Sequence, residues 1–216
     1  MANETAKTFP IGTVIIATQQ TGGKGRYGRF WESPVGNLYL SAVVQDYGEQ
    51  SSLLAFVAGV SVAEALADFD VRLKWPNDVL LNSKKVCGIL LERKDENYMI
   101  AGIGVNINSF PILSDACYEA VSLKAAGISV TREEFLECFL EKFNQYLEKI
   151  RKKELNTIKQ MWKDYAKGIN KNIEVDNFGR KICGKFVGID DKGALVIKTE
   201  NGNEIVCAGD IIYKEE

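Results

Sequence analysis

Residues 53–69 restrict the fold of this chain more than any other segment, because they are apolar on nearly all sides. A helix with that pattern has no face suited to water and has to be covered by other elements. Ser51 and Ser52 come just before it and suit an N-cap. We therefore predict a well-buried helix here, and a chain of 216 residues is long enough to build a core around it.

Short segments rich in β-branched residues surround this helix in the sequence. The pattern predicts strands at residues 12–17, 38–45, 71–74, 79–81, 86–91 and 98–106. From Thr131 onward apolar residues recur every four positions, beginning with Phe135 and Phe139, and Thr131 and Glu134 form a capping-box pattern. An amphipathic helix is therefore predicted, and a second helix is expected at residues 154–165.

The last part of the chain, beyond Gly168, has a third sequence pattern, short strands with turns between them. Short strands are predicted at residues 173–175, 181–189, 194–199 and 204–207, with turn sequences at residues 190–193 and 200–203 between them. A meander of this kind is typical of a small β-barrel. We therefore expect two domains, residues 1–168 and residues 169–216.

Composition excludes several classes of function. Lys and Arg number 27 against 29 Asp and Glu, and the net charge of −2 argues against a strongly basic polyanion binder. The chain has no histidine, which rules out Ser-His-Asp and Cys-His catalysis and the usual Cys/His zinc sites. Its five cysteines form no CxxC pair and suit buried thiols in a reducing compartment. Since no apolar run approaches the roughly 18 residues of a membrane span, we expect a cytoplasmic protein without a membrane segment.

The segment 20–31 combines glycines with three cations, Lys24, Arg26 and Arg29, and contains no acidic residue. Glycines allow backbone N–H groups to face an anion, and the cations add charge-assisted hydrogen bonds. Trp31 offers a face on which a planar base can stack. The spacing matches neither a P-loop nor a dinucleotide fingerprint. The segment suits a loop that wraps a phosphate-bearing nucleotide, although its composition is equally compatible with a solvated basic loop or an RNA contact.

A corner at residues 74–78, Lys-Trp-Pro-Asn-Asp, lies between two predicted strands. It offers a cation, an amide and a carboxylate side by side, and this set suits a nucleotide bound with Mg²⁺. The same residue types are also typical of a polar hairpin end.

Glycines interrupt the next two predicted strands. Lys85 begins a strand that contains Gly88, and Gly102 and Gly104 lie in the following strand, which ends near Asn106. Glycine weakens a strand unless another backbone or a ligand comes close. The three glycines therefore indicate the floor of a slot for a flat small molecule, while Lys85 taken alone is equally typical of a strand end with its charge in water.

In this order and spacing, the four clusters resemble the biotin–protein ligase family. The family's motifs run roughly QTxGRGRxGRxW with SPxGNLYLS, then KWPND, KxxGIL and GIGxNxN. They are matched here by residues 20–31 with 33–41, 74–78, 85–90 and 102–108. The resemblance implies an α+β fold: a catalytic domain with a central mixed β-sheet packed by helices, and a small C-terminal SH3-like β-barrel.

The resemblance also implies a two-step reaction that uses ATP and Mg²⁺. The carboxylate of biotin attacks the α-phosphorus of ATP and gives biotinyl-5′-AMP and pyrophosphate. A lysine of a biotin carboxyl carrier protein or domain, part of a biotin-dependent carboxylase, then takes the biotin and releases AMP. A homodimer is compatible with the resemblance. No helix-turn-helix pattern precedes the motifs, so neither DNA binding nor a repressor role is expected, and no membrane partner is expected.

Site residues follow from the same resemblance, position by position. Arg26 and Lys85 are implied to be catalytic, because they would hold the biotin carboxylate and the α-phosphate. The implied biotin-binding set is Asn3, Gln20, Gly23, Lys24, Gly25, Arg26, Lys85, Gly88 and Gly102. The implied nucleotide-binding set is Arg29, Trp31, Lys74, Asn77 and Asn106. The implied Mg²⁺ ligands are Asp78 and Asn106.

The chain departs from the family pattern at two places. Lys24 stands where the family has arginine, and lysine is a point charge without the guanidinium fork. Met1-Ala2-Asn3 stands where the family has Ser-Thr-Asn, so both hydroxyls that contact the biotin ring are missing.

Three rival interpretations accompany these expectations. They are a related lipoate or octanoate ligase or transferase, a degenerate biotin-binding homologue, and a non-catalytic module that contacts RNA or free nucleotide. The KWPND corner and the barrel-like tail argue against the first, and the low net charge argues against the last.

Overall fold

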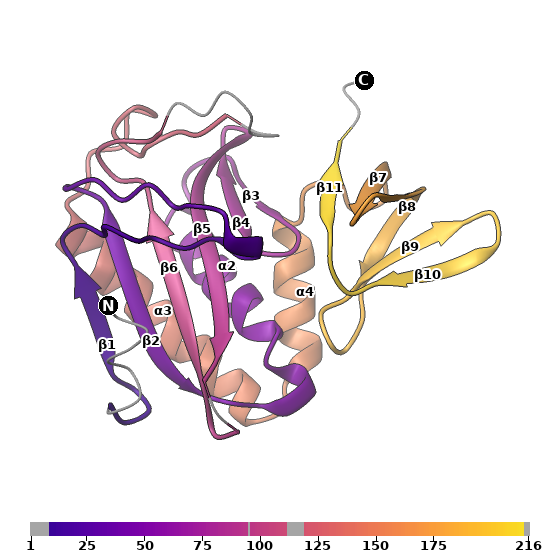
Figure 1. Cartoon of the computed structure of the whole chain (residues 1–216), viewed down its shortest axis with the longest axis horizontal. Coiled ribbons are helices and arrows are strands. Elements are labelled where there is room, and N and C mark those ends of the chain that lie inside the picture. Colours follow the sequence, from indigo (N-terminus) through magenta and orange to yellow (C-terminus); the bar gives the residue numbers. More distant parts are fainter. Residues whose placement is uncertain (1–8, 95, 112–118, 214–216) are drawn as a thin grey trace.

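The computed structural model describes residues 9–94, 96–111 and 119–213, and its α+β architecture confirms the predicted fold class. Two β-sheets lie side by side, and helices cover one face of the first sheet (Figure 1). Asn3, one of the predicted biotin-binding residues, lies outside the described residues together with Met1-Ala2. None of the described helices is long and apolar enough to cross a membrane.

Six strands form the first sheet in the order β1-β2-β6-β5-β4-β3. They are β1 (Val14–Ala17), β2 (Leu38–Gln45), β3 (Val71–Lys74), β4 (Asp78–Leu81), β5 (Lys84–Arg93) and β6 (Tyr98–Val105). Every pair of neighbouring strands is antiparallel. In the described residues, parallel pairing is limited to two isolated bridges, Leu73 with Ala166 and Lys85 with Ala120.

The prediction of a mixed sheet is therefore wrong for the named strands. The reason lies in the connections, because β3, β4, β5 and β6 follow one another through turns rather than through crossover helices. The tightest turn joins β4 to β5 at Asn82 and Ser83, whose φ angles of 50° and 64° are those of a two-residue hairpin loop. Each such turn reverses the strand direction, so the ladders are antiparallel.

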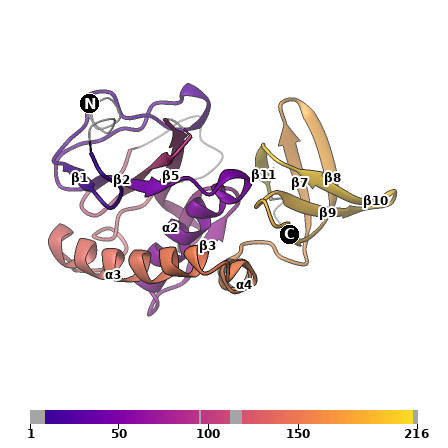
Figure 2. The ribbon, with the colours of Figure 1, turned by 90° about the horizontal axis from the view of Figure 1, so that it is seen from below.

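α2 (Leu53–Glu64) is the buried helix that the sequence predicts, and all of its residues except Glu64 are buried. Gly59 allows it to approach the sheet, because a Cβ there would come within 3.3 Å of the Leu73 side chain. α2 lies between the first sheet and the two later helices (Figure 2). It ends before the expected residue 69, since the chain turns toward β3 with a hydrogen bond from the Phe69 N–H to the Leu66 carbonyl.

α3 (Arg132–Arg151) and α4 (Leu155–Tyr165) confirm the two helices expected from the later apolar period. Thr131 and Glu134 make the reciprocal hydrogen bonds of a capping box at the start of α3. Phe139 and Phe143 are buried and stacked, with ring centroids 5.3 Å apart. Both helices pack on α2 and complete its cover.

Five strands form the second sheet in the order β10-β9-β8-β7-β11, and all neighbours are antiparallel. They are β7 (Asn172–Asn177), β8 (Arg180–Ile189), β9 (Leu195–Thr199), β10 (Gly202–Val206) and β11 (Asp210–Ile212). This sheet confirms the predicted C-terminal meander, and its closure into an SH3-like barrel stays a prediction.

The two sheets share one apolar core across their junction. Trp162 of α4 packs against Phe56 of α2 and Phe186 of β8, with ring centroids 4.7 and 6.2 Å away. Trp75 donates a hydrogen bond from its Nε1 to the carbonyl of Gly193 at 3.0 Å. The second sheet is therefore held against the first by α4 and by the corner at residues 74–78.

Candidate functional site

The glycine-rich segment 20–31 folds back on itself. The N–H of Gly25 donates to the carbonyl of Arg29 at 2.7 Å, and the N–H of Trp31 donates to the carbonyl of Gly23 at 3.0 Å. Glycine is required at position 23, since a Cβ there would lie 2.2 Å from the carbonyl oxygen of Trp31. The shape of the predicted loop is thus set by its own backbone contacts.

The indole of Trp31 lies on the predicted glycine floor. Gly88 of β5 and Gly104 of β6 are direct partners in the strand register. A Cβ at either position would lie 2.7 Å from an atom of the indole. Gly102 shares their face, and among the described residues only Leu90 lies within 4 Å of a Cβ built there. The floor therefore has one part that Trp31 covers and one part beside it that the indole leaves open.

Lys85 lies at the edge of this floor, paired with Asp78. The Lys85 Nζ is 2.8 Å from the Asp78 Oδ1 and 5.2 Å from the centroid of the Trp31 ring. Both charged side chains are largely shielded from water, so their attraction is stronger than that of a surface pair. Cys87 next to them is fully buried, and burial, followed by the charge of Asp78, raises the pKa of its thiol. This thiol stays protonated and is no nucleophile.

The corner at residues 74–78 connects the loop to β5. Arg26 donates from Nη1 to the Asn77 Oδ1 at 3.3 Å, and the Asn77 Nδ2 donates to the carbonyl of Ile89 at 2.6 Å. The N–H of Ile89 in turn donates to the carbonyl of Asn77 at 3.0 Å. Asn77 is therefore fixed on both sides and holds the guanidinium of Arg26 beside the floor.

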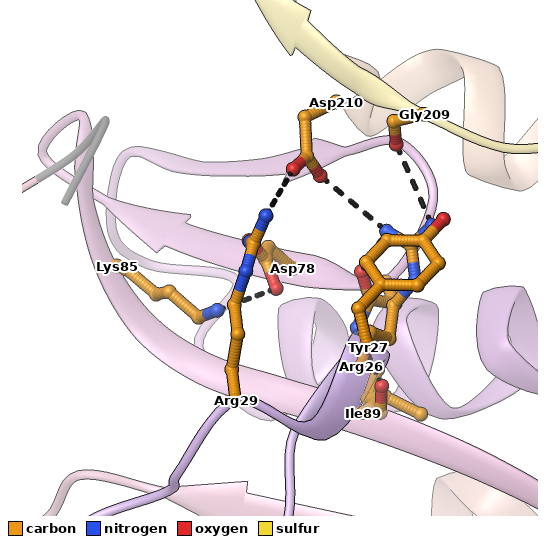
Figure 3. A network of polar contacts seen from close by, with 9 residues as sticks. Arg26, Tyr27, Arg29, Asp78, Lys85, Ile89, Gly209 and Asp210 are labelled. Carbon is orange, nitrogen blue, oxygen red and sulfur yellow. Dashed lines mark hydrogen bonds and ion pairs between the residues drawn. The ribbon is translucent and has the colours of Figure 1, made fainter. Parts of the chain in front are cut away.

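A carboxylate from the second sheet completes the cluster. Asp210, at the start of β11, lies 2.7 Å from the Nη2 of Arg29 and 3.6 Å from the Nη1 of Arg26 (Figure 3). Burial alone would raise the pKa of Asp210, but the hydrogen bond from Arg29 and the charges of Arg29, Arg26 and Lys74 outweigh it and lower that pKa. Asp210 is therefore ionised at neutral pH.

Asn106 and Lys74 are the most buried members of the predicted nucleotide set. Lys74 is 5% exposed and its positive charge acts on Asp210. Asn106 is 2% exposed, and its Nδ2 donates to the carbonyl of Val121 at 3.1 Å. Its Oδ1 has no hydrogen-bond partner among the described residues, which costs about 1–3 kcal/mol for a buried polar group. This oxygen is available to a donor or cation on a ligand.

The remaining predicted residues lie in the loop. Gln20 donates from Nε2 to the Ser33 Oγ at 2.9 Å, which ties the base of the loop together. Lys24 is exposed and forms an isolated bridge with Phe30 through the backbone. Binding of biotin by Gln20 and Lys24 stays a prediction.

A cavity of about 380 Å³ opens between the two sheets and reaches this cluster. Its walls include Arg26 and Asn77 on the site's side and Gly193 and Ala194 of the second sheet's turn. Leu91 of β5 lies along the same cavity. The candidate site is thus continuous with the junction of the two sheets.

Sequence reasoning missed Tyr27, Phe178 and Asp210. Tyr27 packs edge-to-face on Phe178 at 5.2 Å, and the guanidinium of Arg26 lies 4.6 Å from the Tyr27 ring centroid. Asp210 is 181 residues away from Arg29 along the chain. No local pattern marks these two C-terminal residues, because what brings them to the loop is the docking of the second sheet.

The arrangement is suited to binding an anion. Lys85 is neutralised by Asp78, and Arg26 and Arg29 share Asp210. A ligand anion that enters between them can accept further charge-assisted hydrogen bonds from these cations. In the described residues there is no group of three or more Cys, Asp or Glu side chains that could hold a metal ion by itself.

Two family models match this chain. Residues 4–108 match the biotin/lipoate A/B protein ligase family, and residues 168–213 match the biotin protein ligase C-terminal domain. The second match covers the second β-sheet, and the first covers the loop and the glycine floor.

Individual proteins that are similar to this chain carry names that agree with the two family models. The bifunctional ligase/repressor BirA of Bacillus spizizenii is 36% identical over 98% of this chain and 68% of its own length. The biotin–[acetyl-CoA-carboxylase] ligase of Paracoccus denitrificans is 30% identical over 92% of this chain and 89% of its own length. A solved biotin protein ligase from Aquifex aeolicus, in complex with biotin and ATP, has a TM-score of 0.83 and 32% identity, covering 96% of this chain and 92% of that one.

Proposed function

Because this chain belongs to the biotin/lipoate A/B protein ligase family, we propose that it is an ATP-dependent ligase that makes biotinyl-5′-AMP and transfers biotin to a lysine of a biotin carboxyl carrier protein. The observation that carries this proposal is that Lys85, paired with Asp78, and Arg26, held by Asn77, both lie beside a floor of glycines. The relative from Aquifex aeolicus was solved with biotin and ATP, the two small substrates that this reaction needs.

In the first step, Lys85 and Arg26 bring two anions together. An oxygen of the biotin carboxylate attacks the α-phosphorus of ATP, and the bond from this phosphorus to the pyrophosphate oxygen breaks. The two cations offset the repulsion between the carboxylate and the phosphate and stabilise the charge of the transition state. A carboxylate is already ionised at neutral pH, so the step needs no histidine as a base.

We assign the biotin ring to the floor beside Trp31. A flat ring can lie close to a strand only where glycine leaves the face free, as at Gly102. Gly88, which the indole of Trp31 covers, is a proposed contact carried over from the family motif. The loop residues Gln20, Gly23, Lys24 and Gly25 are the other proposed contacts, carried over from the family motif.

The proposed nucleotide contacts are Arg29, Trp31, Lys74, Asn77 and Asn106. Mg²⁺, when bound, would neutralise phosphate charge, and Asp78 and Asn106 supply oxygen ligands of the kind it prefers. The Oδ1 of Asn106, which accepts no hydrogen bond from the residues that the structure describes, fits that role. Two protein oxygens do not complete the shell of this ion, so it would arrive with the triphosphate.

In the second step, the acceptor lysine attacks the mixed anhydride and AMP leaves. The Paracoccus denitrificans relative is named for acetyl-CoA carboxylase, so we propose the biotin carboxyl carrier domain of such an enzyme as acceptor. We further propose that residues 1–168 form the catalytic domain and residues 169–216 the second domain. We also propose that the protein acts in the cytoplasm and that DNA is not one of its partners.

Biotin-dependent ATP–pyrophosphate exchange with Mg²⁺ tests the proposed function. We expect exchange with biotin and none with lipoate or octanoate under the same conditions. Omitting the acid and omitting Mg²⁺ are the controls. Biotinylation of a carrier domain then tests the second step.

Two other outcomes would contradict the proposal. Exchange with lipoate or octanoate alone would place the chain with the related ligases of other acids. No exchange with any acid, while labelled biotin still binds, would mark a degenerate biotin-binding homologue.

A further inference from the structure

The second sheet contacts the loop tip, residues 26–28, at two separate places. The rings of Tyr27 and Phe178 meet edge-to-face, with centroids 5.2 Å apart and an interplanar angle of 79°. Asp210 pairs with Arg26, which lies in the tip, and with Arg29 just after the tip, 2.7 Å away. Both contacts join elements that are distant in sequence, so they exist only when the second sheet is docked.

Phe178 and Asp210 come from neighbouring strands of one sheet. Phe178 lies in the turn between β7 and β8, and Asp210 faces Asp176 in the register of β7 and β11. The Asp176 Oδ1 accepts a hydrogen bond from the N–H of Gly179 at 2.6 Å, which fixes the turn that carries Phe178. The sheet therefore presents an aromatic ring and a carboxylate to the loop as a preformed pair.

Backbone conformation singles out the same two aromatic residues. Tyr27 and Phe178 have φ angles of 58° and 52°, a region that bulky side chains rarely adopt. Their side chains are 51% and 70% exposed, so burial in a core does not account for these conformations. Phe178 and Gly179, with φ angles of 52° and 88°, form the two-residue loop between β7 and β8, and such a loop requires positive φ at both positions. The hairpin thus holds the Phe178 ring out from the sheet, where it contacts the Tyr27 ring.

The contacts between the loop tip and the second sheet are weak enough for the tip to open as well as close. Arg29 is largely exposed in its pair with Asp210, and Tyr27 and Phe178 form a single aromatic pair, so each of these two contacts is a weak interaction that can break when the tip opens. A loop that covers a reactive intermediate has to open for substrates and then stay closed against water. Arg26 lies 4.6 Å from the centroid of the Tyr27 ring, so the position of this ring is coupled to a proposed catalytic cation.

We propose that Phe178 and Asp210 are positioning residues that hold the loop tip closed over the acyl-adenylate. This inference rests on the proposed function. Phe178 acts through Tyr27, and Asp210 acts through Arg26 and Arg29, so neither touches the reacting atoms. The second sheet then sets how long the intermediate is retained, and the first sheet carries the chemistry.

The test uses the full chain with Phe178→Ala and Asp210→Asn. Trypsin cleavage after Lys24, Arg26 and Arg29, without ligands, reports opening of the loop. Escape of labelled biotinyl-AMP after a single turnover reports retention. We expect Phe178→Ala to raise both rates about 3- to 10-fold, the effect of losing one weak contact, and Asp210→Asn to act in the same direction.

Two substitutions serve as controls. Phe178→Tyr keeps the ring and should restore both rates to those of the parent chain. Ile205→Ala removes an exposed apolar side chain from β10 of the same sheet and should leave both rates unchanged. If Phe178 acts through Tyr27, the double variant Tyr27→Ala with Phe178→Ala should be no worse than the more severe single variant.

Unchanged cleavage and escape in folded Phe178→Ala and Asp210→Asn would overturn the inference. Slower escape in Asp210→Asn would also overturn it for Asp210, since that carboxylate would then compete with the ligand anion. If no adenylate forms from biotin, the proposed function fails, while trypsin cleavage still decides whether the second sheet holds the loop.

Discussion

The floor of the site and the tip of its loop are held in different ways. Gly88 and Gly104 are paired within the antiparallel ladder of the first sheet, and Asn106 at its end is buried. Tyr27 is half exposed and depends on Phe178, which belongs to another sheet. The floor is thus held by strand pairing and burial, whereas closure of the tip depends on a few weak contacts. We infer that the floor sets the rate of chemistry and that the tip sets retention.

Removing the cation of the floor should have the largest effect. Lys85→Ala is expected to slow pyrophosphate exchange about 10²- to 10³-fold, because one preorganised positive charge at the transition state is lost. Lys84→Ala is the matched control, since the exposed Lys84 lies at the neighbouring position of the same strand and pairs with Glu119 at 2.6 Å. Normal exchange in Lys85→Ala with an intact fold would remove Lys85 from catalysis.

Removing Arg26, the cation of the tip, should affect retention of the adenylate as well as its formation. Arg26→Gly is expected to raise the rate of biotinyl-AMP escape about 10- to 100-fold, the effect of losing a charged hydrogen bond. Gel filtration of the single-turnover mixture measures the fraction that stays bound. Arg26→Lys should recover part of the retention, because it keeps the charge without the fork. An adenylate held as tightly as in the parent chain would contradict this assignment.

Alanine substitutions at two glycines of the floor compare a position that the Trp31 indole covers with a position that is open to a ligand. Gly104→Ala should destabilise the fold by about 1–3 kcal/mol, since its Cβ would lie 2.7 Å from the Trp31 Nε1 and the indole must move. Gly102→Ala should cost less than about 0.5 kcal/mol, because the nearest atom is 3.5 Å away. It should nevertheless weaken biotin binding. Denaturant unfolding and biotin titration measure the two effects. Equal effects of the two substitutions on stability would contradict the conclusion that the indole covers Gly104 and leaves Gly102 open.

Sequence patterns were sufficient for features whose cause is local. The all-round apolar pattern of residues 53–69 predicts a buried α2, and glycine within a strand, as at Gly88, predicts a close approach. The close neighbour at Gly88 proved to be the indole of Trp31, which a pattern cannot identify. Strand direction was mispredicted, because it depends on how successive turns connect the strands.

Features that depend on docking of the second sheet could not be predicted. Asp210 follows a glycine in a meander of ordinary composition, and nothing near it in sequence indicates a partner for Arg29. Phe178 sits in a hairpin turn where an exposed aromatic residue has no local explanation. Asn106 was predicted as a ligand-binding amide, but only the packed structure shows that its Oδ1 has no partner in the described part of the chain.

The smallest expected effect is the contribution of Asp210 to stability, and it depends on pH. The folded pKa of Asp210 lies below its ordinary value of 3.8, so its contribution is present at neutral pH and is lost as the pH falls through the folded pKa. Asp210→Asn should therefore cost less than about 1 kcal/mol at neutral pH and nothing in strong acid. Denaturant unfolding of both chains at several pH values measures the difference, and a constant difference at all pH values would show that the carboxylate charge is not its cause.

One single-turnover measurement tests the division between floor and tip most directly. Labelled biotin and Mg²⁺-ATP are mixed with excess parent chain, Lys85→Ala or Phe178→Ala, and the rates of adenylate formation and escape are followed together. Our account predicts that Lys85→Ala slows formation, whereas Phe178→Ala speeds escape and leaves formation nearly unchanged. If both variants change the same rate, the floor and the tip have no separate roles and the account is contradicted.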